Sequence, residues 1–466
     1  MNTNIPIVQG YANDQQYTSA ATEEYGEDSF NGQKGNPQPK KFNDVFFAIL
    51  FYIHLTAMAI ALPMAINAQD QNGGGNSGTF GSIIYFVSVC SIFSVGLSTV
   101  SLGFMIKFSR QLVQIALYFY IGFSFLLMVI MFMAASMLMG GLFALSFAFS
   151  ICYARAVQSR IPFAAANLTA ALTAVKANVG LTMVAYVFMF VGFGYSVAWT
   201  TISNAVLNTY PGMAFFLFLS FYWTHQVLKN TMHVTTAGVI GTWWFAPDEA
   251  SSLCSRSIGD SFVRATTYSF GSICFGSLIV ALIQALRQLN RHLRENRDAQ
   301  LIVCLIDCVL GCIEGLIEYF NKWAYVYVGL YGYSYLDAGR NVIQLFQNKG
   351  WTTLITDDLA GMVLFMISIM IGLFTGLIGF IVASLDANIF ADFNFDASPE
   401  GVGFGFGFLI GVVLASIMLG VVESAVSTCI VCFAESPAEF EQNHPSLSLE
   451  MREAWRSSWP TECGNM

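Results

Sequence analysis

The stretch FYWTHQVLKNTMHVTTAGVIGTWWF, at residues 221–245, decides how often this chain crosses a membrane. It is almost wholly apolar, but Lys229 and Asn230 interrupt it near its middle. The surrounding apolar run, 212–245, would be about 51 Å long as a single helix, at about 1.5 Å per residue. A hydrocarbon core is about 30 Å thick, so the run is long for one crossing and short for two.

The rest of the chain is equally apolar. Hydrophobic residues make up 55% of the 466 residues and charged residues only 11%, whereas a soluble domain carries about 25% charged residues. Repeated apolar runs of about 18 residues or more predict an all-α polytopic membrane helical bundle. The runs are 44–66, 82–106, 111–134, 136–156, 179–201, 212–245, 268–289, 301–331, 360–384 and 404–433.

The polar ends of the chain flank this membrane domain. Residues 1–41 are too poor in apolar side chains to fold, and we predict a disordered cytoplasmic tail. The membrane domain is predicted at 42–433 and a cytoplasmic C-terminal tail at 434–466. The net charge of −9, without a basic patch, argues against nucleic acid. No phosphate-binding loop, catalytic triad or metal-ligand set is visible, so we expect neither an enzyme nor a cofactor nor a metal site.

Basic residues predict the topology, because they favour the cytoplasmic side. Lys40 and Lys41 place the N-terminus inside, and the arginine-rich stretch RQLNRHLRENR, 287–297, is predicted inside too. That requires two crossings within 212–245, with a turn at Lys229–Asn230. A Lys at mid-span costs roughly 2.5–3.5 kcal/mol, which a turn avoids. A single crossing is the alternative.

The run 301–331 then begins on the inner side and has an amphipathic pattern. Asp307, Glu314 and Glu318 share one helical stripe, which predicts a helix along the inner membrane surface. Its acidic stripe is either a solvated face or a cytoplasmic gate. About ten crossings result, with both termini cytoplasmic. A second stripe is either buried or S-acylated; it contains Cys304, Cys308 and Cys312.

Several stretches resemble the choline-transporter-like family, in particular its fungal branch. They are HVTTAGVIGTWWF (233–245), YSFGSICFGSLIVALIQALRQL (268–289), IEYFNKWAYVYVGLYGYSYLDAGRN (317–341) and VESAVSTCIVCFAESP (422–437). The resemblance implies a ten-span plasma-membrane protein with both ends cytoplasmic. Animal relatives are associated with uptake of choline and related amines. The first external loop is short here and lacks the glycosylation sequon of animal members.

A choline-like cation offers no N–H donor, so its site needs aromatic faces and a nearby carboxylate. The aromatic candidates could equally form an interfacial belt; they are Trp199, Tyr222, Trp223 and Trp243. Glu423, within the last span, is the candidate that balances the charge, unless it only bonds a neighbouring helix. His225 and His233 could line a polar path or simply pack.

Two functions follow from these residues. The first is a transporter of choline or related organic cations through the bilayer, for which the substrate is the only small-molecule partner. The alternative is a membrane scaffold that organises lipids or protein partners without transport. The surroundings of Glu423 distinguish them: a polar cavity with aromatics favours transport, and a closed bundle favours a scaffold.

Overall fold

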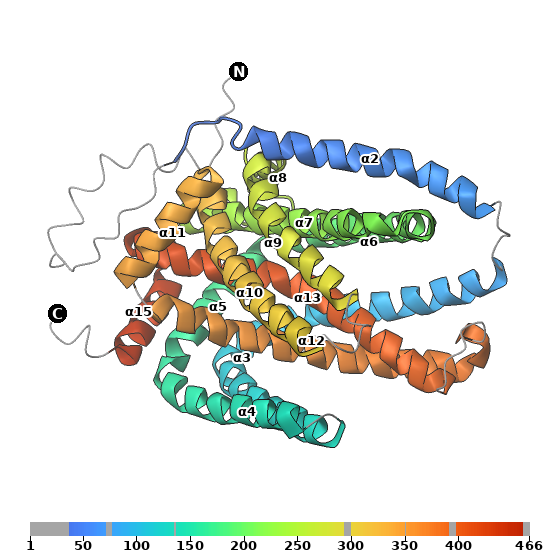
Figure 1. The fold of residues 1–466 in the computed structure, drawn as a ribbon. Coiled ribbons are helices and arrows are strands. Elements are labelled where there is room, and N and C mark those ends of the chain that lie inside the picture. The colour runs from blue at the N-terminus through green and yellow to red at the C-terminus, as the bar shows by residue number, and fades with distance from the viewer. Residues whose placement is uncertain are drawn as a thin grey trace, which may run out of the picture. The chain divides into compact units, whose positions relative to one another are not determined.

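The computed structural model describes residues 37–70, 77–134, 137–292, 300–349, 351–390 and 398–459. Within them the chain is helical and contains no strand, as predicted (Figure 1). The predicted disordered tail lies outside the described residues except for its last part, 37–41. The helices form two compact units, which we call unit 1 (Met1–Gly75 and Ala177–Asn348) and unit 2 (Asn76–Lys176 and Lys349–Met466).

Unit 1 is built on five long helices with two shorter ones at one end. α6 and α7 lie side by side, and α7 also contacts α9 and α10. The helices are α2 (Val45–Asp70), α6 (Gly180–Thr209), α7 (Ala214–Phe245), α8 (Arg256–Thr266), α9 (Phe270–His292), α10 (Gln300–Tyr331) and α11 (Tyr335–Lys349).

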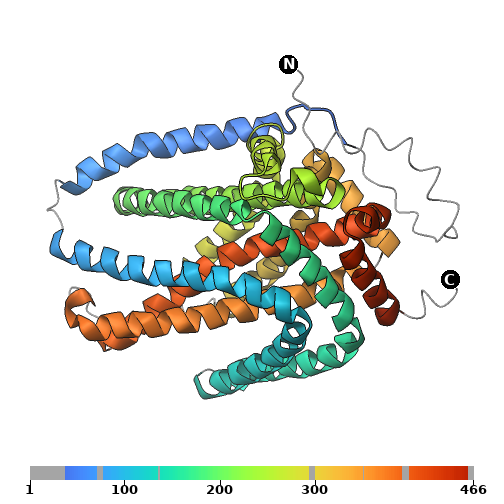
Figure 2. The ribbon, with the colours of Figure 1, turned by 180° about the vertical axis from the view of Figure 1, so that it is seen from behind.

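Unit 2 is dominated by two long helices that lie side by side, α12 and α13 (Figures 1 and 2). α3 has non-helical backbone at Phe108 and is therefore two helical arms. The helices are α3 (Ser77–Ala134), α4 (Met137–Val157), α5 (Ile161–Ala177), α12 (Trp351–Leu385), α13 (Pro399–Glu435), α14 (Pro437–Asn443) and α15 (Pro445–Ser458).

Small residues allow α12 and α13 to approach closely. A Cβ on Gly379 would lie 2.2 Å from the carbonyl oxygen of Gly403, and one on Gly407 would lie 2.7 Å from that of Thr375. The backbones touch without an intervening side chain, which is how membrane helices pack tightly. Gly405, on the same helix as Gly403 and Gly407, faces open space.

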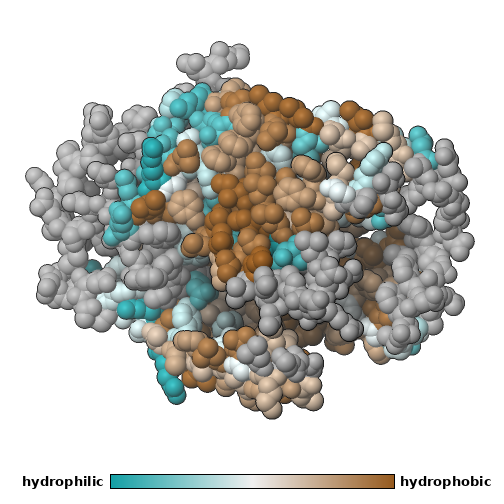
Figure 3. Space-filling view, in the orientation of Figure 1, coloured by the Kyte–Doolittle hydropathy of each residue, from teal (hydrophilic) through white to brown (hydrophobic). Residues whose placement is uncertain are grey.

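Seven helical stretches of the described chain are long and apolar enough to cross a membrane. One of them, Ile84–Met133, contains both arms of α3. Counting those arms separately gives eight candidate crossings; α7 and α10, each 32 residues long, are not among the seven stretches but would bring the number to the predicted ten. Apolar side chains gather on the exposed face of α2 (Figure 3); they include Phe46, Ile49, Ile53, Ile60 and Met64. Such a face suits lipid contact, and the protein is a multi-pass membrane protein.

The predicted turn in the run 212–245 is wrong. α7 is one continuous helix of 32 residues, and Lys229 lies exposed near its middle. Asn230 is buried, and its side-chain amide donates to Ser277 Oγ at 2.9 Å. The Asn230 side chain is therefore satisfied within the bundle, and no turn is needed to hydrate it.

The single α7 helix also changes which basic residues share one end of unit 1. We call this the N-proximal end: α2, α6 and α9 begin there, and α7 and α10 end there. Asn43 N–H donates to the Tyr268 carbonyl at 3.0 Å, and Asn178 Nδ2 donates to that of Ala250 at 2.7 Å. α9 runs away from this end. Arg287, near the close of α9, therefore lies toward the end opposite Lys41, contrary to the predicted topology.

α10 is not the surface helix that its amphipathic pattern predicts. It packs along α7 and α9 and ends beside the start of α2, where Gln38 N–H donates to the Tyr331 carbonyl at 2.8 Å. Its acidic stripe faces α7 and α9, so the expectation of a solvated face is wrong. Cys308 and Cys312 are exposed on another face, and the Cys304 side chain lies outside the described residues.

Candidate functional site

Two groups of polar side chains lie inside unit 1, and both involve α7. We call the first the imidazole cluster: His54 of α2, Tyr195 and Ser196 of α6, and Ser220 and His225 of α7. His54 Nε2 and Ser220 Oγ share a hydrogen bond of 2.7 Å, and Tyr195 OH lies 2.6 Å from the same Ser220 oxygen. Three membrane helices are thereby joined at one serine hydroxyl.

His225 forms the second half of the imidazole cluster. Its Nδ1–H donates to the Phe221 carbonyl at 2.9 Å, and its Nε2 lies 3.1 Å from Ser196 Oγ. The Ser196 hydroxyl also lies 2.9 Å from the Gly192 carbonyl, which can only accept. The Ser196 hydroxyl thus lies within hydrogen-bonding distance of both an α6 carbonyl and the His225 ring, and it links α6 to α7.

Aromatic rings surround the His54 side of this cluster. Trp223 is buried, and its ring lies 5.4 Å from that of His54 and 5.0 Å from that of Phe51, between centroids. The Trp223 indole N–H donates to the Cys274 carbonyl at 3.0 Å, which fixes the ring against α9. Rings held in this way present their faces inside the protein, where a cation would be attracted to them.

The second group is the carboxylate cluster: Gln226 of α7, Gln284 and Arg287 of α9, and Asp307, Glu314 and Glu318 of α10. Gln226 Nε2 donates to Glu318 Oε1 at 2.9 Å, and Gln284 Nε2 donates to Glu314 Oε1 at 2.9 Å. Gln284 also donates to Glu318 at 3.4 Å. The two glutamates are four residues apart in α10, so one face of that helix serves both amides.

Arg287 closes the carboxylate cluster at its far end. Its Nε donates to Asp307 Oδ1 at 3.1 Å, and its Nη1 bonds Glu314 Oε2. The Arg287 and Glu314 side chains are 23% and 14% exposed. Two carboxylates therefore share one guanidinium in a poorly hydrated place, where unpaired charges would be costly.

Between this cluster and the N-proximal end, neutral polar groups join the same helices. Asn321 Nδ2 donates to the Gly276 carbonyl at 3.0 Å, and Tyr335 OH donates to Asn321 Oδ1. Tyr325 OH donates to the Ile273 carbonyl at 3.1 Å. Burial raises the pKa of Tyr335, at the start of α11, to about 12, so this phenol keeps its proton to a higher pH than an exposed tyrosine does.

The aromatic candidates lie in unit 1. Trp199 Nε1 donates to the Leu217 carbonyl at 2.7 Å, and Tyr222 is half-buried beside the Phe221 ring. Trp243 is 3% exposed. It therefore packs inside the protein at the N-proximal end, and the alternative of an interfacial belt is wrong for this residue.

The remaining two candidates, His233 and Glu423, are not members of the imidazole cluster. His233 Nε2–H donates to the Lys322 carbonyl at 2.8 Å, which is a packing role between α7 and α10. Glu423 belongs to unit 2, where it lies on α13 with an exposed side chain. Its neighbours on α13, Ser424 and Ser427, are buried.

Sequence reasoning missed His54, Tyr195, Gln226, Gln284 and Arg287 as members of a site. His54 and Gln284 had a usable signal, because each is a strongly polar residue inside an otherwise apolar run. Arg287 was assigned wholly to topology. The pairing of α9 with α10 could not be read from one sequence.

A family model described as a plasma-membrane choline transporter matches residues 141–438, more than half of the chain. The chain belongs to this family. The match confirms the predicted resemblance and contains the whole carboxylate cluster, while His54 lies before it. The description is that of a membrane transport family rather than an enzyme family.

Curated relatives agree with this membership. A CTL-like protein of Dictyostelium discoideum is 28% identical over 355 residues, which cover 72% of this chain and 63% of that protein. Protein PNS1 of Candida glabrata is 27% identical over 376 residues, covering 71% and 66% of the two chains. Protein PNS1 of Saccharomyces cerevisiae is 26% identical over 375 residues, covering 72% and 69%. This chain therefore spans slightly less than two thirds of the Dictyostelium and Candida relatives.

Proposed function

We propose that this choline-transporter-like family member moves choline or a related organic cation across the plasma membrane, with both termini on the cytoplasmic side. The family description and the two polar clusters of unit 1 support the proposal. Transport requires polar groups at membrane depth. Such groups are energetically costly there, so their presence points to a function.

One observation carries the proposal: the carboxylates of Glu314 and Glu318 face the interior of unit 1 and are bonded by side-chain amides. Glutamine amides hold a carboxylate without neutralising its charge. The Glu318 carboxylate thus stays negatively charged and can serve as the ionic partner of an incoming ammonium group. Arg287 bonds Glu314. Glu318 lies one turn further along α10, where it accepts hydrogen bonds from the neutral amides of Gln226 and Gln284.

The aromatic side of the path is assigned to α7 and its neighbours. Trp223 and His225 stand three positions and one position before Gln226 on α7. The Trp223 indole bonds α9, His225 bonds Ser196 of α6 and Gln226 bonds Glu318 of α10, so α7 offers a ring, an imidazole and a carboxylate contact on its different sides. Each ring face contributes roughly 0.5–2 kcal/mol to a cation. Trp199, Tyr222 and Trp243 remain candidates for the same path, and Glu423 remains a candidate carboxylate in unit 2.

Uptake of labelled choline by the purified full chain in liposomes tests the proposal. We expect saturable uptake that falls at least about tenfold in Glu318→Gln, a change of about 1.4 kcal/mol. Glu441→Gln is the matched control, because Glu441 pairs with Arg452 at 2.7 Å outside the membrane helices. Glu423→Gln belongs in the same series.

The outcomes separate the two functions. If the folded wild-type protein takes up no more choline than empty liposomes, choline is not its substrate. If no amine of that class is taken up, transport fails as a whole and the scaffold alternative gains. Equal uptake by Glu318→Gln and Glu441→Gln would remove Glu318 from the path.

A further inference from the structure

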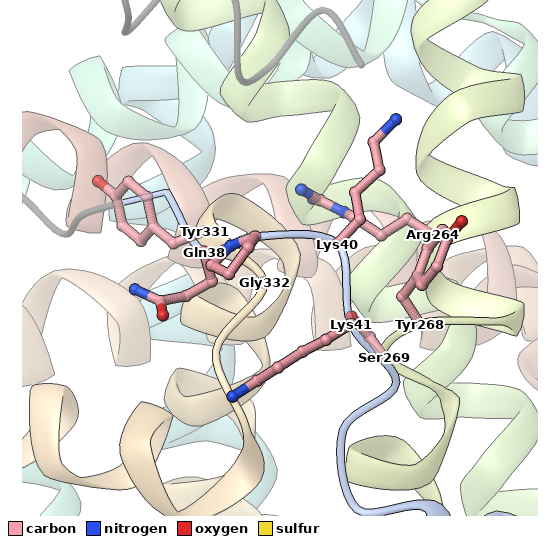
Figure 4. A pocket seen from close by; sticks show the side chains of 9 residues that line it. Gln38, Lys40, Lys41, Arg264, Tyr268, Ser269, Tyr331 and Gly332 are labelled. Carbon is pink, nitrogen blue, oxygen red and sulfur yellow. The ribbon is translucent and has the colours of Figure 1, made fainter. Parts of the chain in front are cut away.

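A small basic cavity lies at the N-proximal end of unit 1, away from both polar clusters. Its volume is about 20 Å³, and Figure 4 shows its lining side chains. The segment before α2, the end of α8 and the end of α10 supply them: Gln38, Pro39, Lys40, Lys41, Arg264, Tyr268, Ser269, Tyr331 and Gly332.

The charged side chains that line this cavity are all cationic. Three of its nine lining residues are cationic and none is acidic. Lys40 and Lys41 are exposed, whereas Arg264 is only 7% exposed. Asp44 follows closely in sequence but does not line the cavity, and its carboxylate is directed to Ser272 Oγ and the Tyr335 N–H. The field in the cavity therefore favours an anion.

The cavity wall is held by hydrogen bonds between distant parts of the chain. Gln38 N–H donates to the Tyr331 carbonyl at 2.8 Å, and Asn43 Nδ2 donates to the Gly332 carbonyl at 3.0 Å. Gly332 has φ +78°, a conformation that favours glycine and turns the chain after α10. The cationic segment is thus fixed over α8 and α10 before any ligand arrives.

We propose that this cavity binds the phosphate group of an anionic membrane lipid. The volume holds one or two water-sized atoms, which suits phosphate oxygens but not a whole nucleotide. The rest of the ligand must therefore lie outside the cavity. Lys41 lies four residues before α2, whose exposed face is apolar, so a lipid can place its head group here and its chains along that helix.

Figure 4 also separates the roles of the cations, because Lys41 extends in a different direction from Lys40 and Arg264. Lys40 and Arg264 would contact the phosphate, and Lys41 would add to the attraction at the surface. The site is formed by the segment before α2 and by the ends of α8 and α10. A ligand that contacts all three would therefore stabilise unit 1.

Thermal unfolding of the purified full chain, titrated with short-chain phosphatidic acid, tests the site, since a ligand of the folded state raises its unfolding temperature. We expect phosphatidic acid to act and phosphatidylcholine to have no comparable effect. Each neutralised cation should weaken the apparent affinity about fivefold. Lys40→Gln tests an exposed cation of the cavity, and Arg264→Gln tests the buried one.

Arg256→Gln is the matched control. Arg256 lies on the same helix, α8, and its exposed side chain pairs with Asp260 at 3.5 Å. A Lys40→Gln effect no larger than that of Arg256→Gln would overturn the proposal. Equal stabilisation by inorganic phosphate and phosphatidic acid, lost in Lys40→Gln, would support the phosphate site but assign it to a free anion. This readout does not depend on choline uptake.

Discussion

Replacing Arg287 with glutamine should destabilise unit 1 more than any exposed charge change. The substitution removes the guanidinium that holds Asp307 and Glu314, whose side chains are 22% and 14% exposed. Breaking one partner of a buried ion pair costs roughly 3–5 kcal/mol because the other charge remains. The partial exposure of both carboxylates lowers this, and we expect a loss of about 2–4 kcal/mol.

A double-mutant cycle isolates the interaction from other effects of the substitution. The free energy of unfolding in detergent micelles is measured for Arg287→Gln, Glu314→Gln and the double variant. We expect a coupling energy of about 2 kcal/mol, because Glu314→Gln relieves part of the unpaired charge. The Arg256–Asp260 pair, with side chains 68% and 30% exposed, is the control and should couple by under about 0.5 kcal/mol. Equal coupling in the two pairs would refute the buried arrangement.

Three further predictions concern packing, pH and topology. Gly379→Val should cost about 1–3 kcal/mol by forcing α12 from α13, while Gly405→Val, facing open space, should leave the unfolding midpoint nearly unchanged. Folding favours protonated Tyr335, whose pKa of about 12 exceeds the usual 10. Stability should therefore fall by up to about 1.4 kcal/mol per pH unit between pH 10 and 12, and Tyr335→Phe should lack that part of the slope. Cysteines placed at Ser252 and Lys41, both exposed, should react with an impermeant reagent from the same side of the membrane; opposite sides would contradict a single crossing by α7.

The fold class could be predicted from the sequence because hydrocarbon thickness acts on every span in the same way. Runs such as 360–384 and 404–433 match α12 and α13 in place, if not in full length. Glycines recur in both runs, and in the structure Gly379 and Gly403 make the close contact between the two helices. Gly405 differs because a helix turns only one face toward its partner, and the sequence did not say which.

The candidate site was only partly predictable, because its members are assembled by helix pairing. Trp223 and His225 were found as aromatic and polar residues at membrane depth. His54 lies in α2 and Tyr195 in α6, and only the packing of α2, α6 and α7 brings them to Ser220. Hydropathy gives the length of each helix but not its rotation about its own axis, on which every such contact depends.

The wrong prediction of a turn in 212–245 has a definite physical cause. Arg287 was counted as a cytoplasmic signal, yet its charge is compensated by Asp307 and Glu314 on the next helix. An arginine whose charge is compensated by carboxylates has little effect on the orientation of its helix in the membrane. The carboxylates that compensate it belong to the acidic stripe of α10, which had suggested a surface helix. Once the two are paired, α7 can cross once. Arg256 and Arg264, which a turn in 212–245 would place on the outer side, then share the N-proximal end with Lys40 and Lys41.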